Sequence, residues 1–423
     1  MTYTLRVLDR ELDELIPGLA AIAIEGAKGV GKTETAQRRA GETFRLDVPE
    51  ILEVVQADPS VIGAARRPVL VDEWQRHPPV WDYVRREVDA GAPAGSFLLA
   101  GSAVPKDAPV HSGAGRIVSL RMRPLSLAER QLVVPTVSLA DLLDGTRPAV
   151  QGTSPVAVVD YVREILASGL PGIRPLPGRA RKLQLDGYLS RVIDRDFPEQ
   201  SLAVRRPQEL RRWLTAYAAA TSGTATYETI GRAAAAGDAS IQARNTIIGY
   251  RDVLERLYLL EQLPGWAPTR NHFGKIGTSP KHHLADPALA ARLLGVDAQA
   301  LMRGEDAGPS LPRDGTLLGA LFESLITLSV RVYAQAADAH VRHFRTRDGR
   351  HEADLIIERD DQRIIAVEVK LAASPGADSV KHLLWLQDQL GDELLDAVVI
   401  TTGQRAYRRD DGIAVIPAAL LGP

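Results

Sequence analysis

The fold of this chain is decided by one stretch near its N-terminus, Gly26-Ala27-Lys28-Gly29-Val30-Gly31-Lys32-Thr33. The stretch fits the phosphate-binding loop pattern G-x-x-x-x-G-K-[ST] at every fixed position. The apolar run before it, residues 19–24, predicts a buried parallel strand, and residues 33–40 after it predict the start of a helix. Because strand, glycine loop and helix are the context that this pattern requires, the sequence predicts an α/β domain built around a phosphate site.

Each part of the loop has a chemical reason. Glycines let the backbone fold tightly enough for successive N–H groups to surround phosphate oxygens, and the helix N-terminus adds partial positive charge. Lys32 is expected to reach the β- and γ-phosphates, and the Thr33 hydroxyl is expected to ligate Mg²⁺. The predicted ligands are therefore ATP or ADP with Mg²⁺, bound by residues 26–33. The alternative is a glycine turn that caps an unrelated helix.

The composition is that of an ordinary globular protein. The 423 residues are 45% hydrophobic and 25% charged, which gives enough length for about two to four domains. With 51 Lys+Arg against 53 Asp+Glu the net charge is −2, so any nucleic-acid surface has to be a local patch. The absence of cysteine excludes disulfides and thiolate zinc sites. Because residues 1–6 carry no apolar signal and no run reaches roughly 18 apolar residues, we expect a cytoplasmic protein without a membrane partner.

A second apolar strand, residues 68–73, ends in the carboxylates Asp72 and Glu73. After a phosphate loop, this arrangement is the Walker B motif of nucleoside triphosphatases. Asp72 is expected to orient Mg²⁺ and Glu73 to polarise the attacking water, because ligands bind at the C-terminal ends of parallel strands. A third strand, residues 96–100, leads to Ser102, which is in position to sense the γ-phosphate. The alternatives are solvated acids at a strand end and a plain strand-to-loop turn.

Residues 113–129 complete the pattern with a glycine–arginine segment, a strand, a Pro-Leu-Ser turn and an Ala-Glu pair. Over roughly residues 18–130 the chain resembles a family of prokaryotic, archaeal-ATPase-like AAA proteins. The resemblance implies that Arg116 is an arginine finger or sensor that acts within one subunit or across an interface, in which case the protein self-associates. The alternative is a solvated arginine at the start of a strand.

The turn-rich residues 144–155 mark the expected end of the ATPase core. The pattern then becomes helical from Val156, and residues 174–212 contain ten Arg and Lys against five Asp and Glu, a net charge of +5. This interval is either the solvated surface of helices or a contact for a phosphate backbone.

Residues 207–263 predict a winged helix-turn-helix, with helices at 208–221 and 227–233 and a third from about residue 240. Polar side chains at the start of that third helix are in the position of a recognition helix: Gln242, Arg244 and Asn245. The turn-rich residues 265–281 predict the wing. Such modules read DNA, but they also serve as protein interfaces or packing units, and both alternatives stay open.

The last region carries a second set of chemical residues on a predicted β-hairpin. Glu368 and Lys370 lie on one face of its second strand, because side chains alternate with period two, and Asp354 on the first strand can lie beside them. Two carboxylates can hold a divalent cation, and a lysine can position the attacking water or stabilise developing charge. This pattern resembles the PD-(D/E)XK nuclease superfamily, which implies Glu323 on a preceding helix as a further metal ligand. The usual proline before the aspartate is replaced by Ala353.

The expected fold class is α/β with three parts: a P-loop AAA-type ATPase domain (1–150), a helical and winged-helix region (151–300) and a nuclease-like α/β domain (301–423). The ATPase family that the chain resembles also carries a C-terminal domain of nuclease-like fold. The implied function is an ATPase whose nucleotide state drives a module acting on DNA. The alternative is a nucleotide-controlled regulator or scaffold whose nuclease-like domain does not cleave.

Overall fold

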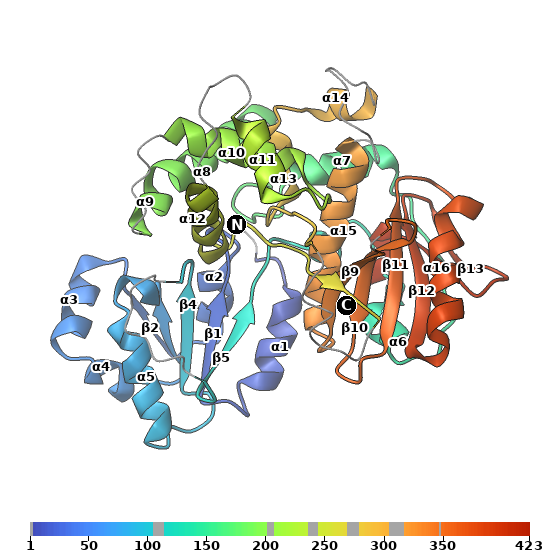
Figure 1. Cartoon of the computed structure of the whole chain (residues 1–423). Helices are drawn as coiled ribbons and strands as arrows, with labels where there is room; N and C mark the ends of the chain where they lie inside the picture. Colours follow the sequence, from blue (N-terminus) through green and yellow to red (C-terminus); the bar gives the residue numbers. More distant parts are fainter. Residues whose placement is uncertain are drawn as a thin grey trace.

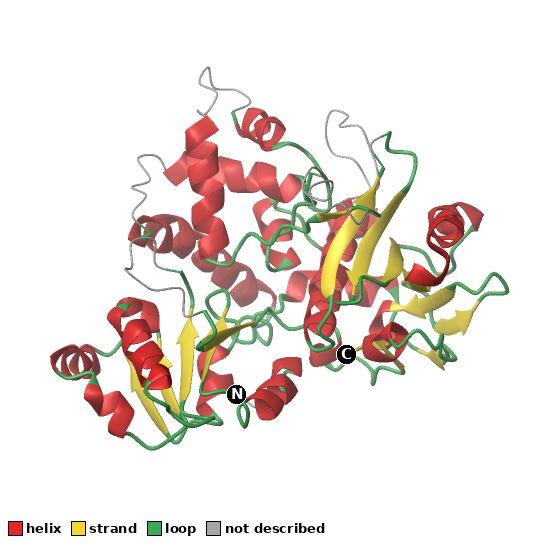
Figure 2. Ribbon diagram, turned by 60° about the horizontal axis from the view of Figure 1, so that its bottom comes forward, coloured by secondary structure: helices red, strands yellow, loops and turns green. Residues whose placement is uncertain are grey.

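The computed structural model describes residues 3–104, 114–200, 207–235, 244–268, 279–303, 317–346 and 348–423. They form an N-terminal α/β domain, a helical region and a C-terminal α/β domain (Figure 1). The two sheets lie at opposite ends of the molecule with helices between and above them, as a second view also shows (Figure 2).

The N-terminal sheet has five parallel strands, and the strand before the loop, β1, is the last but one in spatial order. In spatial order they are β2 (Glu42–Arg45), β3 (Val69–Asp72), β4 (Phe97–Gly101), β1 (Ala21–Glu25) and β5 (Ile117–Arg121). Ile22 and Ile24 of β1 belong to one apolar cluster, whereas Ala21 and Ala23 belong to another. Both faces of this strand are therefore buried, which explains its continuous apolar sequence.

Five helices accompany this sheet: α1 (Val7–Leu15), α2 (Lys32–Gln37), α3 (Pro49–Ala57), α4 (Ser60–Ala64) and α5 (Pro79–Asp89). The sequence pattern of residues 54–65 predicts one helix, but the structure has two, because α3 ends before Asp58 and α4 starts at Ser60. Asp58 is extended because the residue before a proline disfavours the helical conformation, and Pro59 cannot donate a helical hydrogen bond.

After the N-terminal sheet, the chain crosses to the C-terminal domain earlier than expected. The crossing elements are β6 (Val137–Ser138), α6 (Leu139–Leu143) and β7 (Gly152–Thr153). Strand β6 pairs with β15 (Leu421–Gly422), β7 pairs with β13 (Arg405–Arg408), and α6 packs on β11 and β12. Part of the interval 1–150 is thus packed in the C-terminal domain, because the apolar face of α6 is buried there.

The helical region lies above the N-terminal sheet in Figure 1. Its elements are α7 (Val158–Ala167), α8 (Gly178–Arg191), the π-helical turn η3 (Val192–Asp196), α9 (Phe197–Glu199), α10 (Pro207–Ala219), α11 (Tyr227–Ala234), α12 (Arg244–Arg256), α13 (Pro287–Leu293) and α14 (Ala298–Arg303). Apolar residues at helical spacing are buried on α12 and just after it: Tyr250, Val253, Leu254 and Leu257.

The three helices expected for a winged helix are present as α10, α11 and α12. Isolated bridges join Thr221 to His282 in parallel, and Leu260 to Leu284 and Leu263 to Lys281 in antiparallel fashion. Residues 269–278, most of the expected wing, and Gln242 lie outside the described residues, as does the side chain of Arg244. Asn245 is exposed. The winged-helix assignment therefore stays a prediction.

The C-terminal domain contains an eight-stranded sheet in the order β7-β13-β14-β12-β11-β10-β9-β8. The strands not yet given are β14 (Ala414–Pro417), β12 (Leu394–Thr401), β11 (Ile364–Lys370), β10 (Glu352–Glu358), β9 (His340–Arg345) and β8 (Gly265–Trp266). The expected hairpin is present as antiparallel β10 and β11, with Leu355 opposite Val367. The start of the expected wing, β8, joins this sheet beside β9.

Two long helices pack on the C-terminal sheet, α15 (Leu317–Gln335) and α16 (Ala377–Leu390). Helix α15 is long and apolar enough to cross a membrane by length and composition, but 78% of its most apolar window is buried inside the protein, as in a core helix. One apolar cluster contains Ile22 of β1, Trp213 of α10 and Ile416 of β14. The three parts of the chain therefore share a continuous core.

Candidate functional site

The phosphate-binding loop has the backbone geometry that its glycines permit. Gly31 has φ 105°, in the left-handed region where a side chain would be strained. At Gly26, an added Cβ would lie 2.1 Å from the carbonyl oxygen of Met122, so only glycine fits beside this strand end. The two positions show why the loop pattern fixes glycine at both.

Lys32 lies inside the loop. Its Nζ donates hydrogen bonds to the carbonyl oxygens of Gly26, at 2.9 Å, and Ala27, at 3.0 Å, and the residue is only 5% exposed. Burial lowers the pKa of Lys32 to about 8, although the nearby Glu73 and Asp72 carboxylates act to raise it. The ammonium group is thus held at the loop, close to both acids of the Walker B motif.

Thr33 and Asp72 meet at the C-terminal edge of the parallel sheet. The Thr33 hydroxyl donates to both carboxylate oxygens of Asp72, at 2.9 and 3.0 Å. Burial raises the pKa of Asp72, and the hydrogen bond from Thr33 acts in the opposite direction. A hydroxyl beside a buried carboxylate, next to a phosphate loop, is the set of oxygen ligands that Mg²⁺ takes in such domains. The residues therefore fit the expected cation.

Glu73 and Ser102 are brought together from neighbouring strands. Glu73 Oε2 accepts hydrogen bonds from Gln75 Nε2 at 2.5 Å and from Ser102 Oγ at 3.2 Å, and Gln75 Nε2 also contacts Ser102 Oγ at 3.1 Å. Glu73 itself has φ 56°, an uncommon backbone conformation for glutamate. Sequence reasoning placed Glu73 and Ser102 at this edge but missed Gln75.

Arg116 precedes strand β5, at the end of the parallel strands that is opposite to the loop. Ile117 pairs with Ala21 at the start of β1, whereas Arg121 pairs with Glu25 at the end next to the loop. Five residues of strand span about 16 Å, so Arg116 is not placed to reach a nucleotide bound to its own domain. It is exposed and forms an ion pair with Asp89 at 2.8 Å. An action within one subunit is therefore disfavoured, and an action across an interface stays a prediction.

A basic residue that the sequence analysis did not single out is found at the loop edge instead. The guanidinium of Arg121 lies 3.8 Å from the ring centroid of Tyr258, and the Tyr258 hydroxyl donates to Glu25 Oε2 at 2.9 Å. The Arg121 charge acts on Lys32, whose pKa it helps to lower. The end of β1 is thus tied to the segment that follows α12.

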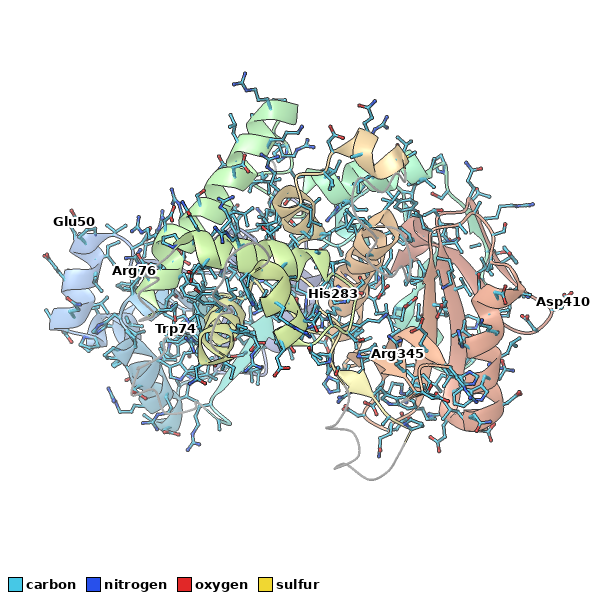
Figure 3. All side chains as sticks on the ribbon, turned by 45° about the horizontal axis from the view of Figure 1, so that its top comes forward. Glu50, Trp74, Arg76, His283, Arg345 and Asp410 are labelled. Carbon is cyan, nitrogen blue, oxygen red and sulfur yellow. The ribbon has the colours of Figure 1, made fainter. Side chains whose placement is uncertain are left out.

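The helical region covers the loop. Lys28 Nζ forms an ion pair with Asp196 Oδ1 of η3 at 3.1 Å, and the Tyr188 hydroxyl of α8 donates to the Lys28 carbonyl oxygen at 3.1 Å. A cavity of about 140 Å³ lies between them, lined also by Glu73 and Ser102. Figure 3 shows Trp74 and Arg76 where the N-terminal domain faces the helical region. Small-molecule sites have volumes of about 300–1,000 Å³. A nucleotide therefore has to displace the cap that Asp196 and Tyr188 form over Lys28 of the loop.

The second expected constellation also comes together. Glu323 of α15, Asp354 of β10, and Glu368 and Lys370 of β11 lie at one site. Lys370 Nζ is 2.5 Å from Glu368 Oε1, and Asp354 Oδ2 accepts a hydrogen bond from the Val369 amide at 2.9 Å. Glu368 is 2% exposed, and its Oε2 is buried without a hydrogen-bond partner among the described residues.

The residue that sequence reasoning missed here is Lys281. Its Nζ lies 2.7 Å from Glu323 Oε1 and 2.8 Å from Asp354 Oδ1. Burial raises the pKa of Glu323 and of Glu368 to about 8, and the Asp354 charge adds to both shifts. Burial acts to raise the pKa of Asp354 as well, but Lys281 holds it below its usual range.

The ammonium group of Lys281 lies between two of the three expected metal ligands. Among the described residues, no group of three or more His, Asp or Glu side chains is placed to hold a metal ion. The expectation of a second divalent cation at Glu323, Asp354 and Glu368 therefore finds no support in this arrangement. The physical reason is that the Lys281 ammonium occupies the position beside Glu323 Oε1 and Asp354 Oδ1 that a metal ion would need.

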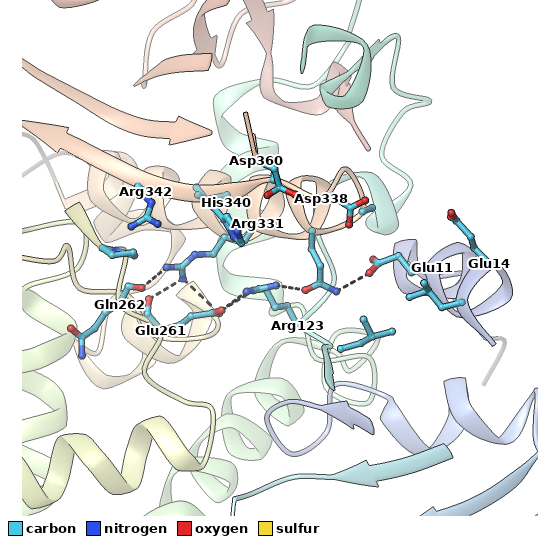
Figure 4. A pocket seen from close by; sticks show the side chains of 17 residues that line it. Glu11, Glu14, Arg123, Glu261, Gln262, Arg331, Asp338, His340, Arg342 and Asp360 are labelled. Atoms are coloured by element: carbon cyan, nitrogen blue, oxygen red, sulfur yellow. Dashed lines mark hydrogen bonds and ion pairs between the residues drawn. The ribbon is translucent and has the colours of Figure 1, made fainter. Parts of the chain in front are cut away.

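A cavity of about 760 Å³ is away from both sites, between α1, β9 and α15 (Figure 4). A chain of polar contacts crosses it. Arg123 forms an ion pair with Glu261 at 2.7 Å and donates to Gln335, whose amide donates to Glu11. Arg331 donates to the Glu261 carbonyl oxygen at 2.9 Å. Because these charges pair with one another, we assign no ligand to this cavity and regard it as a junction between domains.

Three family profiles match separate parts of the sequence. Residues 20–131 match the AAA domain, residues 159–300 match a domain of unknown function (DUF8612), and residues 318–421 match another domain of unknown function (DUF4143). No curated protein matches the chain. The AAA match includes the loop and both Walker B acids, so the N-terminal part is an AAA-type ATP-binding domain. The other two profiles assign no activity.

Solved structures with a similar arrangement are distant. The Walker-type ATPase PABY2304 of Pyrococcus abyssi is 14% identical, covers 67% of this chain and 94% of its own, and has a TM-score of 0.40. The Aeropyrum pernix ORC2 protein in ADPNP–ADP complexes is 17% identical over 70% of this chain and 93% of its own, with a TM-score of 0.30. Drosophila ORC bound to DNA is 13% identical over 68% and 94%, with a TM-score of 0.23. At these TM-scores the likenesses carry no argument about ligands or partners.

Proposed function

We propose that the chain is a Mg²⁺-dependent ATPase in which residues 26–33 hold the triphosphate and Glu73 polarises the attacking water. The proposal is carried by the pairing of Thr33 with Asp72 at 2.9 Å beside Glu73, all at one edge of the sheet. A bound Mg²⁺ would supply charge neutralisation on the β- and γ-phosphates. Lys32 contributes a second positive charge, and its low exposure strengthens that charge by excluding water.

Gln75 and Ser102 act on the orientation of Glu73. Both donate to the same carboxylate oxygen, Oε2, so the carboxylate plane is held by two hydrogen bonds. A general base works only when it is within hydrogen-bond reach of the proton that it takes, and an oriented carboxylate meets this need at less entropic cost. In this proposal Ser102 is a positioning residue, and it can also contact the γ-phosphate.

The test is ATP turnover by the full chain and three variants. Lys32→Ala should bind MgATP at least about tenfold more weakly, a loss of about 1.4 kcal/mol. Glu73→Gln should bind MgATP like the parent but turn it over at least about 10²-fold more slowly, since the shape is kept and the base is lost. Glu53→Gln, on the exposed face of α3, is the matched control and should behave like the parent. Parental turnover in both Lys32→Ala and Glu73→Gln would rule out the proposed site.

We further propose that nucleotide state acts on the helical region, because Lys28 of the loop is bound to Asp196 and Tyr188 there. DNA is the first partner to test, since residues 174–212 are basic and Asn245, in the first turn of α12, is exposed. If DNA is the partner, ATP turnover should change when duplex DNA is added, and the effect should weaken with salt.

The second candidate function is a nucleotide-controlled regulator whose C-terminal domain does not cleave. One observation favours it: Lys281 lies between Glu323 and Asp354, where a nuclease would hold its cation. In that case DNA should remain uncut with Mg²⁺ or Mn²⁺ at any nucleotide state. Cleavage that is lost in both Asp354→Ala and Lys370→Ala would instead favour the nuclease.

A further inference from the structure

The C-terminal carboxylate cluster consists of Glu323, Asp354 and Glu368. These side chains are 15%, 11% and 3% exposed, so water contributes little to their solvation. Three buried carboxyl groups require either protonation or compensation by positive charge, because the transfer of each charge out of water is costly. Lys281 and Lys370 supply two positive charges, and one negative charge is left over at full ionisation.

Lys281 is presented to the cluster by the segment that pairs with residues 260–263. The Lys281 amide donates to the Leu263 carbonyl oxygen, and the Leu263 amide donates back, both at 2.9 Å. The next residue, His282, donates its amide to Gly223 and has its ring against Tyr217 and Tyr227 of the helical region. The backbone around Lys281 is therefore held by the helical region and also by β9, where the ring of His343 contacts the Ser279 carbonyl oxygen at 2.9 Å.

The two ion pairs of Lys281 occupy the oxygens that a divalent cation would need. Distances of 2.7 and 2.8 Å to Glu323 Oε1 and Asp354 Oδ1 are those of charge-assisted hydrogen bonds. A divalent cation would approach the same oxygens to about 2.0–2.6 Å. One position cannot hold both. A third oxygen, Glu368 Oε2, is buried and has no hydrogen-bond partner in the part of the chain that the structure describes.

We propose that Lys281 is a built-in cation that replaces a divalent metal at this cluster, and that its removal uncovers a divalent-cation site made by Glu323, Asp354 and Glu368. The site in the parent protein is thus closed by the chain itself. Removing the ammonium leaves three buried carboxylate groups with one positive charge between them, and a hard cation with oxygen preference restores the balance. This inference does not depend on the ATPase activity.

The experiment is a titration of the nucleotide-free full chain with Mn²⁺, in which free Mn²⁺ is followed by electron paramagnetic resonance. The parent should show no binding that depends on Glu368, so parent and Glu368→Gln should bind Mn²⁺ equally. Lys281→Met, which keeps the length and apolar bulk of the side chain, should gain one site per chain with a Kd of about 10⁻⁵–10⁻³ M. The double variant Lys281→Met/Glu368→Gln should lose that site.

Two further variants are controls. Lys281→Arg keeps a cation and should behave like the parent, and Lys182→Met removes an exposed lysine of α8 and should gain no site. Folding of Lys281→Met is checked by its thermal unfolding and by ATP binding at the parental affinity. The proposal is overturned if folded Lys281→Met gains no Mn²⁺ site. It is also overturned if the parent binds Mn²⁺ and loses it on Glu368→Gln, a comparison that does not require Lys281→Met to fold.

Discussion

Neutralising Asp196 should tighten nucleotide binding. Asp196 of η3 accepts a hydrogen bond from Lys28 Nζ at 3.1 Å and so places a negative charge against the loop that is to hold phosphates. The Lys28 side chain is 43% exposed and that of Asp196 is 9% exposed, so solvent screens the pair on one side only. The substitution Asp196→Asn keeps the shape of the side chain and removes its charge.

The size of the effect follows from the exposure of the pair. Ion pairs with a solvent-exposed partner contribute about 0.2–1 kcal/mol. Nucleotide binding has to displace the cap, and with it the ion pair between Lys28 and Asp196, so this energy opposes binding in the parent. Repulsion between the Asp196 carboxylate and the phosphates acts in the same direction and is reduced by salt. Asp196→Asn should therefore lower the Kd for MgATP by about 1.4- to 5-fold.

The assay is isothermal titration calorimetry of MgADP and a non-hydrolysable ATP analogue at low and high salt. The matched control is Asp194→Asn, which removes the same charge from an exposed position of the same turn. The gain should be larger for the triphosphate than for the diphosphate and should shrink at high salt. Weaker binding by Asp196→Asn, or an equal gain in Asp194→Asn, would refute the reasoning that the cap opposes phosphate.

Two other predictions concern the same domain. Because burial lowers the pKa of Lys32 to about 8 and a bound phosphate favours its charged form, the complex holds more protons than the free protein near that pH. MgATP binding should therefore take up a proton near pH 8 and weaken at higher pH, as measured calorimetrically in buffers of different ionisation enthalpy, and Lys32→Ala should remove the uptake. If Arg116 acts across a subunit interface, mixing Arg116→Ala with Glu73→Gln protein should restore part of the turnover that each lacks. No restoration at any ratio, with oligomers confirmed by light scattering, would argue against a finger.

The nucleotide site could be predicted from the sequence because its parts are either local or aligned by the sheet. The loop is a run of eight residues whose geometry is set by glycine. Thr33 and Asp72 are 39 residues apart, but parallel strands place their C-terminal ends at one edge, so the contact follows from the strand assignment. The pairing of Asp354 with the second strand of its hairpin follows from the alternation of side chains in the same way.

The contacts that sequence reasoning missed depend on packing between regions. Lys281 is 42 residues from Glu323 and 73 residues from Asp354, and it lies among turn formers where no period or motif marks it. Asp196 and Lys28 are 168 residues apart and meet only because the helical region folds over the loop. The local sequence pattern is the same whether a lysine or aspartate lies on a solvated helix face or closes a site.

The strength of the Lys281 contacts limits what nucleotide binding can do to the C-terminal site. The end of β1 is bound through Glu25 to Tyr258, and the segment after Tyr258 is bound to Lys281 through the two backbone hydrogen bonds of Leu263. Each such bond contributes about 0.5–1.5 kcal/mol net, whereas leaving a buried ion pair with one partner missing costs about 3–5 kcal/mol. A displacement transmitted from the ATPase domain therefore breaks the backbone hydrogen bonds between Leu263 and Lys281 first. The ammonium group stays with Glu323 and Asp354. For this reason nucleotide state alone should move the helical region and leave the carboxylate cluster closed, unless a partner or a competing cation stabilises the open form.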